Sequence, residues 1–196
     1  MIAIVNYQAG NLASVKKALD YLDQESVITA DPAMVARAER VVLPGVGHFS
    51  VTAALARSGL ADAIRDSIQR GVPFLGICVG LQWLFAASEE APGNQGLGLF
   101  AGKCERFPAS VKSPHVGWNS IELCRESRLF CGVPQGAFVY YTHSYRAPLV
   151  PEAAATSEYG GTFTAAVERD NVFGVQFHPE KSGKTGLKIL ENVCSA

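Results

Sequence analysis

The feature that most constrains the fold is a G-x-C-x-G motif at residues 76–80, which joins an apolar run to a helix-like run. Residues 73–77 read as a buried strand, and residues 81–87 are predicted to continue as a helix. Glycines two positions either side of Cys78 remove side chains that would clash where strand and helix approach closely. The motif is the cysteine counterpart of the G-x-S-x-G turn that exposes a nucleophile. It therefore predicts an α/β fold with Cys78 at the carboxyl end of a sheet strand.

The rest of the first half alternates short apolar runs with helix-like runs. Strands are predicted at residues 2–5, 26–29 and 40–43, the last of them stopped by a Pro-Gly pair. Helices are predicted after Gly10, where apolar residues recur at helical spacing, and across residues 52–70. This alternation predicts a mostly parallel central sheet flanked by helices.

The second half has strand-like runs with few helices between them, at residues 118–123, 137–141, 163–168 and 172–177. This pattern predicts an antiparallel extension of the sheet. Ser182 is predicted to cap a closing helix. Because no repeat or Pro/Gly/Ser-rich linker divides the chain, we expect one domain over residues 1–196.

Charge and cysteine content exclude several classes of protein. The formal net charge of −1 gives no reason to expect nucleic acid or an anionic membrane surface as partner. No apolar stretch is long enough to span a bilayer, and the first residues lack the features of a signal peptide. The five cysteines are odd in number and include no CxxC pair, which argues against a disulfide framework and a zinc site. We therefore expect a cytoplasmic protein without metal or other cofactor.

Cys78 is the candidate nucleophile. The positive end of the following helix favours thiolate over thiol. The backbone N–H of Val79 has no intrahelical acceptor and is free to donate to an oxyanion. The motif alone fits a buried core cysteine between two packing glycines equally well, so a catalytic role requires partners elsewhere in the chain.

The segment Phe-His-Pro-Glu at residues 177–180 supplies such partners. Pro179 keeps His178 out of a helix, and in an extended segment residues i and i+2 face the same side. Glu180 is therefore expected to hold one imidazole nitrogen of His178 while the other takes a proton from Cys78. Nucleophile, base and orienting carboxylate together follow the logic of a catalytic triad.

The segment at residues 41–47 ends a strand with two glycines that flank Val46. Its peptide groups rotate at little cost, so Val46 or Gly47 is expected to aim a second backbone N–H at the oxyanion. An ordinary strand-to-helix turn is the alternative, and this segment alone favours that alternative.

With these motifs the chain resembles the class I (triad) glutamine amidotransferases over essentially its whole length. Residues 76–82 are similar to that family's nucleophile segment, and residues 177–180 to its histidine–glutamate pair. The match is closest to the branch of the family that serves histidine biosynthesis. The segments that carry it are Asn6-Tyr7 with Gly10-Asn11, and residues 43–47, 115–119, 140–145 and 177–182.

The resemblance implies a glutaminase that forms a cysteine thioester with glutamine and passes ammonia to a (β/α)8-barrel cyclase subunit in a heterodimer. The residues implied in holding glutamine are Gly45, Gln82, His143, Ser144 and Tyr145. The residues implied in docking the cyclase are Asn11, Trp118, Tyr140 and Lys181. For Trp118 a place in the core is the alternative, and for Lys181 a solvated charge.

Other interpretations stay open on the residues alone. His143 competes with His178 as base but lacks an adjacent carboxylate, and the roles of His48 and His115 are not assigned. The anthranilate and pyridoxal phosphate glutaminases are rival branches of the family. A scaffold subunit with a dead site conflicts with the intact Cys78, His178 and Glu180. A cysteine peptidase has no supporting sequence feature.

Overall fold

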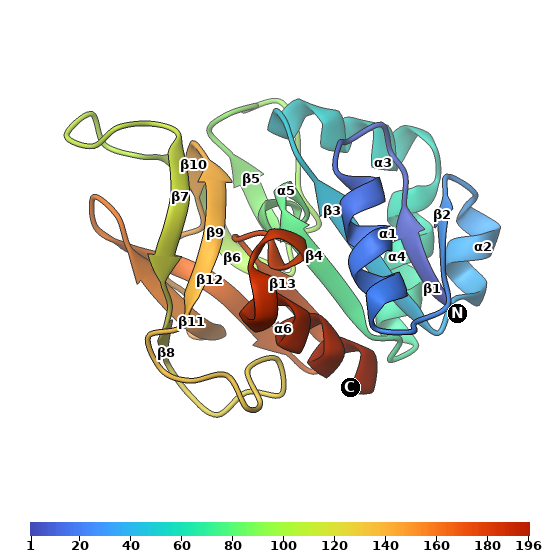
Figure 1. Cartoon of the computed structure of the whole chain (residues 1–196). Coiled ribbons are helices and arrows are strands. Elements are labelled where there is room, and N and C mark those ends of the chain that lie inside the picture. The colour runs from blue at the N-terminus through green and yellow to red at the C-terminus, as the bar shows by residue number, and fades with distance from the viewer.

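The computed structural model describes residues 1–196 and is built around an eight-stranded sheet (Figure 1). In spatial order its strands are β2 (Ser26–Thr29), β1 (Ile2–Val5), β3 (Arg40–Gly45), β4 (Phe74–Cys78), β13 (Val172–Val175), β12 (Thr162–Arg169), β11 (Ala153–Glu158) and β8 (Glu122–Leu123). The pairs from β2 to β13 are parallel, and those from β13 to β8 are antiparallel. The predicted α/β class is confirmed.

Helices flank the parallel part of this sheet (Figure 1). They are α1 (Leu12–Tyr21), α2 (Pro32–Arg37), α3 (Ala53–Arg57), α4 (Leu60–Gln69), α5 (Val79–Trp83) and α6 (Gly183–Ser195), with 3-10 turns η1 (Phe49–Thr52) and η2 (Pro179–Lys181). Strands β1 and β4 are buried along their whole length, as expected for parallel strands covered on both faces. None of the helices combines the length and the apolar character needed to cross a membrane.

Two smaller sheets lie beside the main one. The first contains β5 (Phe85–Ser88), β6 (Phe100–Arg106) and β10 (Tyr145–Arg146). The second is a two-stranded antiparallel ribbon of β7 (His115–Ser120) and β9 (Phe138–His143), which lies across the molecule from α2 (Figure 1). The antiparallel extension was therefore predicted correctly for residues 163–168, whereas residues 118–120 and 137–141 lie mainly in the separate ribbon.

Two predicted helices were wrong in extent. The helix expected across residues 52–70 is divided at Gly59, whose φ of 76° is left-handed and cannot continue an α-helix. The helix expected at residues 81–87 ends at Trp83, and Phe85 begins a strand that pairs with Phe100 of β6. In the second case pairing with a distant segment overrides the local apolar pattern.

Ser182 precedes α6, but its hydroxyl does not cap the helix as predicted. The hydroxyl donates to the carbonyl oxygen of His178 at 2.7 Å and accepts from the backbone N–H of Tyr140 at 2.9 Å. Ser182 therefore joins the start of the last helix to the β9 strand and to the segment that carries His178.

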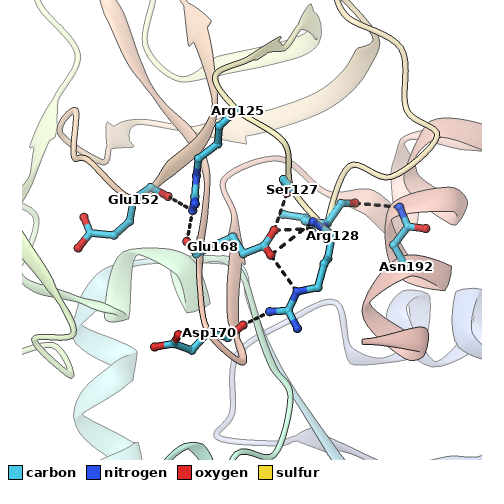
Figure 2. Close-up of polar contacts among 8 residues, drawn as sticks. Arg125, Ser127, Arg128, Glu152, Glu168, Asp170 and Asn192 are labelled. Atoms are coloured by element: carbon cyan, nitrogen blue, oxygen red, sulfur yellow. Dashed lines mark hydrogen bonds and ion pairs between the residues drawn. The ribbon is translucent and has the colours of Figure 1, made fainter.

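Glu168 at the end of β12 organises a polar cluster on the antiparallel side (Figure 2). Its carboxylate accepts hydrogen bonds from the Ser127 hydroxyl, the Leu129 backbone N–H and the Arg128 guanidinium. Burial raises the pKa of the Glu168 carboxyl, but the hydrogen bonds from these donors lower it by more. The net pKa therefore lies below its usual value of 4.5. The cluster fixes the loop at residues 125–131 against the sheet.

Glu168→Gln is expected to destabilise the chain by about 1–3 kcal/mol at neutral pH, because a neutral amide replaces an ion that accepts several hydrogen bonds. Since the folded-state pKa is depressed, this contribution is present above pH 4.5 and is lost as the pH falls through the folded value. Urea unfolding of both chains at several pH values should show the difference shrink in acid. If the two chains still differed as much in unfolding free energy at low pH, the electrostatic explanation would be wrong. The control is Glu191→Gln, because Glu191 pairs with Lys188 on the surface and should contribute little.

Candidate active site

Cys78 is the last residue of β4, which lies between β3 and β13 in the sheet. Gly45 of β3 is its register partner on one side, and on the other side Val175 of β13 pairs with Ile77. Cys78 has φ 55° and ψ −105°, and α5 begins at the next residue. A non-glycine residue with positive φ and this ψ lies outside the favoured regions of the backbone, and such strain is typical of functional sites. The geometry is that of the predicted nucleophile turn.

Close backbone approach explains the glycines around this turn. A Cβ on Gly80 would lie 2.0 Å from the carbonyl oxygen of Leu43, and one on Gly76 would lie 2.5 Å from the carbonyl oxygen of Gly80. A Cβ on Gly45 would meet the Tyr7 hydroxyl at 2.4 Å and the Val79 Cβ at 2.8 Å. Each contact is shorter than packed atoms tolerate, so β3, β4 and α5 meet only if these positions carry no side chain.

His178 and Glu180 form a buried pair. Nδ1 of His178 lies 2.7 Å from Oε1 of Glu180, and both side chains are fully buried. Glu180 reaches the ring from the η2 turn and not from an extended segment, which corrects the predicted local geometry. Oε1 also accepts a hydrogen bond from the Asn11 side-chain amide. The carboxylate therefore holds the tautomer that presents Nε2 of His178 as the free nitrogen.

The charge state of His178 is set by its neighbours. Burial lowers the pKa of the imidazole, but the nearby Cys78 sulfur and the hydrogen bond and charge of Glu180 raise it to a net value of about 10. Nε2 is buried and without a hydrogen-bond partner. A cationic imidazole next to a cysteine is the arrangement that stabilises a thiolate nucleophile.

A small cavity of about 40 Å³ opens at the nucleophile. It is lined by Gly47, Cys78, Val79, Gln82, Glu90, Thr142, His143, Ser144 and Tyr145. Most of the residues predicted to hold glutamine or its oxyanion therefore meet at one place. Gly45 lies beside Cys78 in the sheet but does not line the cavity, and the Val46 side chain is partly exposed.

His143 lines the cavity, but its nitrogens are occupied by partners other than Cys78. Nδ1 lies 2.9 Å from the carbonyl oxygen of Tyr145, and Nε2 lies 3.0 Å from Nδ1 of His115. Burial lowers the pKa of His143 to about 3 and that of His115 to about 4, so both rings are neutral. These contacts leave His178 as the ring with a free nitrogen for the proton of Cys78.

The two unassigned histidines have structural surroundings. His115 is stacked between the rings of Tyr141 and Tyr159, at centroid distances of 4.8 and 4.0 Å. His48 accepts a hydrogen bond from the backbone N–H of Ser50 and caps the η1 turn.

Three of the four predicted docking residues form one surface group. The Trp118 ring packs edge-on against Tyr140 at 6.0 Å, and the Lys181 ammonium lies 6.0 Å from the Tyr140 ring. The Trp118 side chain is 55% exposed, which excludes the alternative that it belongs to the core. Asn11 does not join this surface group through its side chain, because its amide donates a hydrogen bond to Glu180.

Sequence reasoning missed two polar residues at the site. Glu90 is the one carboxylate that lines the cavity, and its Oε2 accepts from the backbone N–H of Phe49 at 2.7 Å. Gln176 is fully buried and its amide contacts Cys78. The position of Gln176 directly before the Phe-His-Pro-Glu segment was an available signal. Nothing local to Glu90 marks it in the sequence.

Comparison with known proteins gives the same assignment as the geometry. The model of the glutamine amidotransferase class-I family matches residues 5–195. A solved structure described as a glutamine amidotransferase superposes with a TM-score of 0.77 at 18% identity, covering 99% of this chain and all of that one. PurLQS from Thermotoga maritima gives 0.76 at 21% identity, with 99% and 97% covered. The chain therefore belongs to the class-I glutamine amidotransferases.

Its sequence relatives define the branch more closely. The imidazole glycerol phosphate synthase subunit HisH of Moorella thermoacetica is 48% identical, covering 97% of this chain and 92% of that protein. The subunit of the same name from Thermococcus kodakarensis is also 48% identical, with 98% of each chain covered. Within the class, this chain is a member of the HisH family.

Proposed function

We propose that this chain is the glutaminase subunit of an imidazole glycerol phosphate synthase. It hydrolyses glutamine to glutamate and ammonia. The ammonia passes to a (β/α)8-barrel cyclase subunit, which forms imidazole glycerol phosphate and AICAR in histidine biosynthesis. The observation that carries the proposal is the strained Cys78 beside the buried His178–Glu180 pair, in a chain 48% identical to HisH subunits. That identity favours this branch over the anthranilate and pyridoxal phosphate glutaminases.

In the proposed reaction the proton of Cys78 Sγ is held on Nε2 of His178 before attack, which leaves a thiolate beside an imidazolium. The thiolate attacks the side-chain amide carbon of glutamine, and a tetrahedral oxyanion forms. His178 returns the proton to the departing nitrogen, so ammonia leaves and a glutamyl thioester remains. A water molecule, deprotonated by the same imidazole, then hydrolyses the thioester and restores Cys78. Glu180 keeps the imidazole in the required tautomer throughout.

Substrate recognition is assigned from the lining of the cavity. Glu90 supplies the one carboxylate and complements the α-ammonium group of glutamine. Gln82 and the backbone of Ser144 and Tyr145 offer polar groups to the rest of the amino acid, and Gly45 acts indirectly by letting β3 pack closely against Val79 at the start of α5. The oxyanion is assigned to the N–H of Val79, which begins α5, together with a peptide N–H at Val46 or Gly47.

The cyclase is proposed to dock on the surface group of Trp118, Tyr140 and Lys181. Two further apolar side chains of the same ribbon, Val116 and Phe138, are 56% and 59% exposed. An exposed apolar patch with aromatic rings and a flanking cation is typical of a protein interface. Asn11, bonded to Glu180, is proposed to border this surface and to connect it with the triad.

The proposed function is tested by glutamate release with and without the purified cyclase subunit. Glutamine hydrolysis is expected to be slow in the isolated chain and to rise by about 10²–10³-fold in the complex with a bound cyclase ligand. The physical reason is that one rotatable peptide at Val46 or Gly47 supplies an oxyanion donor worth that factor. Absence of hydrolysis under both conditions would contradict a glutaminase, and full activity in the lone chain would contradict activation by docking.

Trp118→Ala is expected to weaken binding of the cyclase subunit by roughly 30-fold in Kd, the size of a 2 kcal/mol interface hot spot. Titration calorimetry with the cyclase subunit measures this change. Tyr21→Ala is the matched control, because Tyr21 is an aromatic residue that is 75% exposed and ends α1, which is not part of the ribbon. Equal affinities of the two variants would place the interface elsewhere.

A further inference from the structure

Gln176 brings a neutral hydrogen-bond donor to the nucleophile. It follows β13, whose Val175 pairs with Ile77 of β4, so the chain places it beside Cys78. Nε2 of Gln176 donates to Sγ of Cys78 at 3.6 Å, within the longer range of bonds to sulfur. The Gln176 side chain has no exposed surface. Its backbone N–H is bonded to the carbonyl oxygen of Ala165 at 2.8 Å, so the residue is fixed on the sheet.

The orientation of the Gln176 amide is fixed by the backbone carbonyl of Tyr145, to which it is linked through the side chain of Gln82. The backbone oxygen of Tyr145 only accepts, so the atom of Gln82 that lies 3.0 Å from it is the donor Nε2. The second N–H of the same nitrogen meets Oε1 of Gln176 at 3.2 Å. The NH₂ group of Gln176 therefore faces Cys78. If the Gln176 amide were rotated by half a turn, its NH₂ group would face the NH₂ group of Gln82, and two donors would meet without an acceptor.

The acceptor that fixes this orientation is itself held in place. The Tyr145 oxygen also accepts from Nδ1–H of His143, whose Nε2 then accepts from Nδ1–H of His115. Both rings are buried and neutral, and they anchor the carbonyl from the β7–β9 ribbon. The donor at Cys78 is thus specified by surrounding groups and does not depend on solvent.

We propose that Gln176 is a further catalytic residue of this site, whose amide N–H stabilises the Cys78 thiolate. The inference rests on the proposed glutaminase function, since it assigns a residue to the same nucleophile. A thiolate is a stronger acceptor than a thiol, so a donor aimed at Sγ favours the charged form. No bond to Gln176 forms or breaks, and the proton of Cys78 passes to Nε2 of His178.

Gln176 donates the one side-chain hydrogen bond that the structure shows to Cys78 Sγ. Burial raises the pKa values of Tyr7 and Cys104 and lowers that of His143, so none of the three adds a charge beside the sulfur. Glu90, which lines the same cavity, opposes a negative charge on sulfur. His178, held by Glu180, provides the one positive charge. Gln176 adds a neutral donor that keeps its hydrogen bond after His178 gives up its proton.

The test is alkylation of Cys78 by iodoacetamide across a range of pH, with the peptide that carries Cys78 resolved by mass spectrometry. The full chain is compared with Gln176→Leu and Gln176→Glu. In the leucine variant the midpoint of the rate profile is expected to move up by about one to two pH units. This shift corresponds to the free energy of one hydrogen bond to a charged group. In the glutamate variant the shift should be larger, because the carboxylate has no N–H and carries negative charge. Gln135→Leu, at an exposed glutamine, is the control and should leave the midpoint unchanged.

Glutamine kinetics in the complex with the cyclase give the second readout. The leucine variant is expected to lose about 10-fold or more in kcat with a smaller change in KM, because the donor acts on the nucleophile. Gln176→Glu keeps the side-chain size and the acceptor for Gln82, so it decides the result if the leucine variant does not fold. An unchanged midpoint in a folded variant would overturn the role of Gln176 and leave the glutaminase standing. A wild-type chain whose Cys78 does not react and that releases no glutamate would instead overturn the proposed function.

Discussion

Cys78→Ala is expected to abolish glutamine-dependent synthesis by the complex while ammonia-dependent synthesis continues. The substitution removes the sulfur at the end of β4 that interacts with the His178 imidazole, and Cys78 is the one cysteine that lines the cavity. A loss of at least about 10⁴-fold in glutamine hydrolysis is expected, as for removal of a triad nucleophile. Cyclase activity with added ammonia bypasses this step and should stay within about twofold of wild type.

Paired assays of one complex preparation, with glutamine and then with ammonium salt, measure both activities. Cys104→Ala is the matched control, because Cys104 is equally buried but bonds weakly to the carbonyl oxygen of Gln82 and does not line the cavity. Continued use of glutamine by the Cys78 variant would show that the nucleophile has been assigned to the wrong residue. Loss of both activities would show that the variant disrupts the complex.

Gly80→Ala is expected to destabilise the fold by about 3 kcal/mol or more, at the upper end for single substitutions. The new methyl group would lie 2.0 Å from the Leu43 carbonyl oxygen, and neither group is on a flexible side chain. β3 and α5 must then separate, which displaces Cys78 from the cavity. Because a misplacement of about 1 Å costs on the order of 10² in rate, the remaining folded protein should also be a poor glutaminase.

Urea unfolding and glutaminase assays of the same samples test the two effects together. Gly93→Ala is the control, since a Cβ at Gly93 would meet no atom within 4 Å. A Gly80→Ala chain as stable and active as the control would mean that the strand and helix do not approach as closely as described. Loss of stability alone would separate packing at the turn from placement of the nucleophile.

The chemistry of the site was predictable from sequence because its main groups lie in short local motifs. The turn at Cys78 needs glycines at fixed offsets, and the pairing of His178 with Glu180 depends only on a two-residue separation and an intervening proline. The strands at residues 2–5 and 26–29 were placed at their observed bounds, because each is rich in β-branched residues and is followed by polar turn residues.

What sequence reasoning missed depends on contacts between distant segments. Glu90 and Gln176 reach the site through the folding of β5, β6 and β13, and no local pattern gives their distance from Cys78. The strand at Phe85–Ser88 forms because Phe100 of β6 pairs with it, although its own sequence continues a helical pattern. Likewise, the exposed face at Trp118 follows from a separate ribbon, whereas the succession of strand-like runs had assigned residues 118–123 to an extension of the main sheet.

β4 is central in the main sheet, whereas the β7–β9 ribbon has only two strands, and this difference should be visible in amide hydrogen exchange. β4 lies in the middle of eight strands, so its amide hydrogens should exchange only when the whole domain unfolds. The ribbon has two strands and exposed apolar side chains, so its amides should exchange by local opening. Cyclase docking would then slow deuterium uptake at residues 115–120 and leave that at residues 74–78 unchanged. The nucleophile would be preformed in the free subunit, whereas the surface that receives the partner would gain its order on assembly.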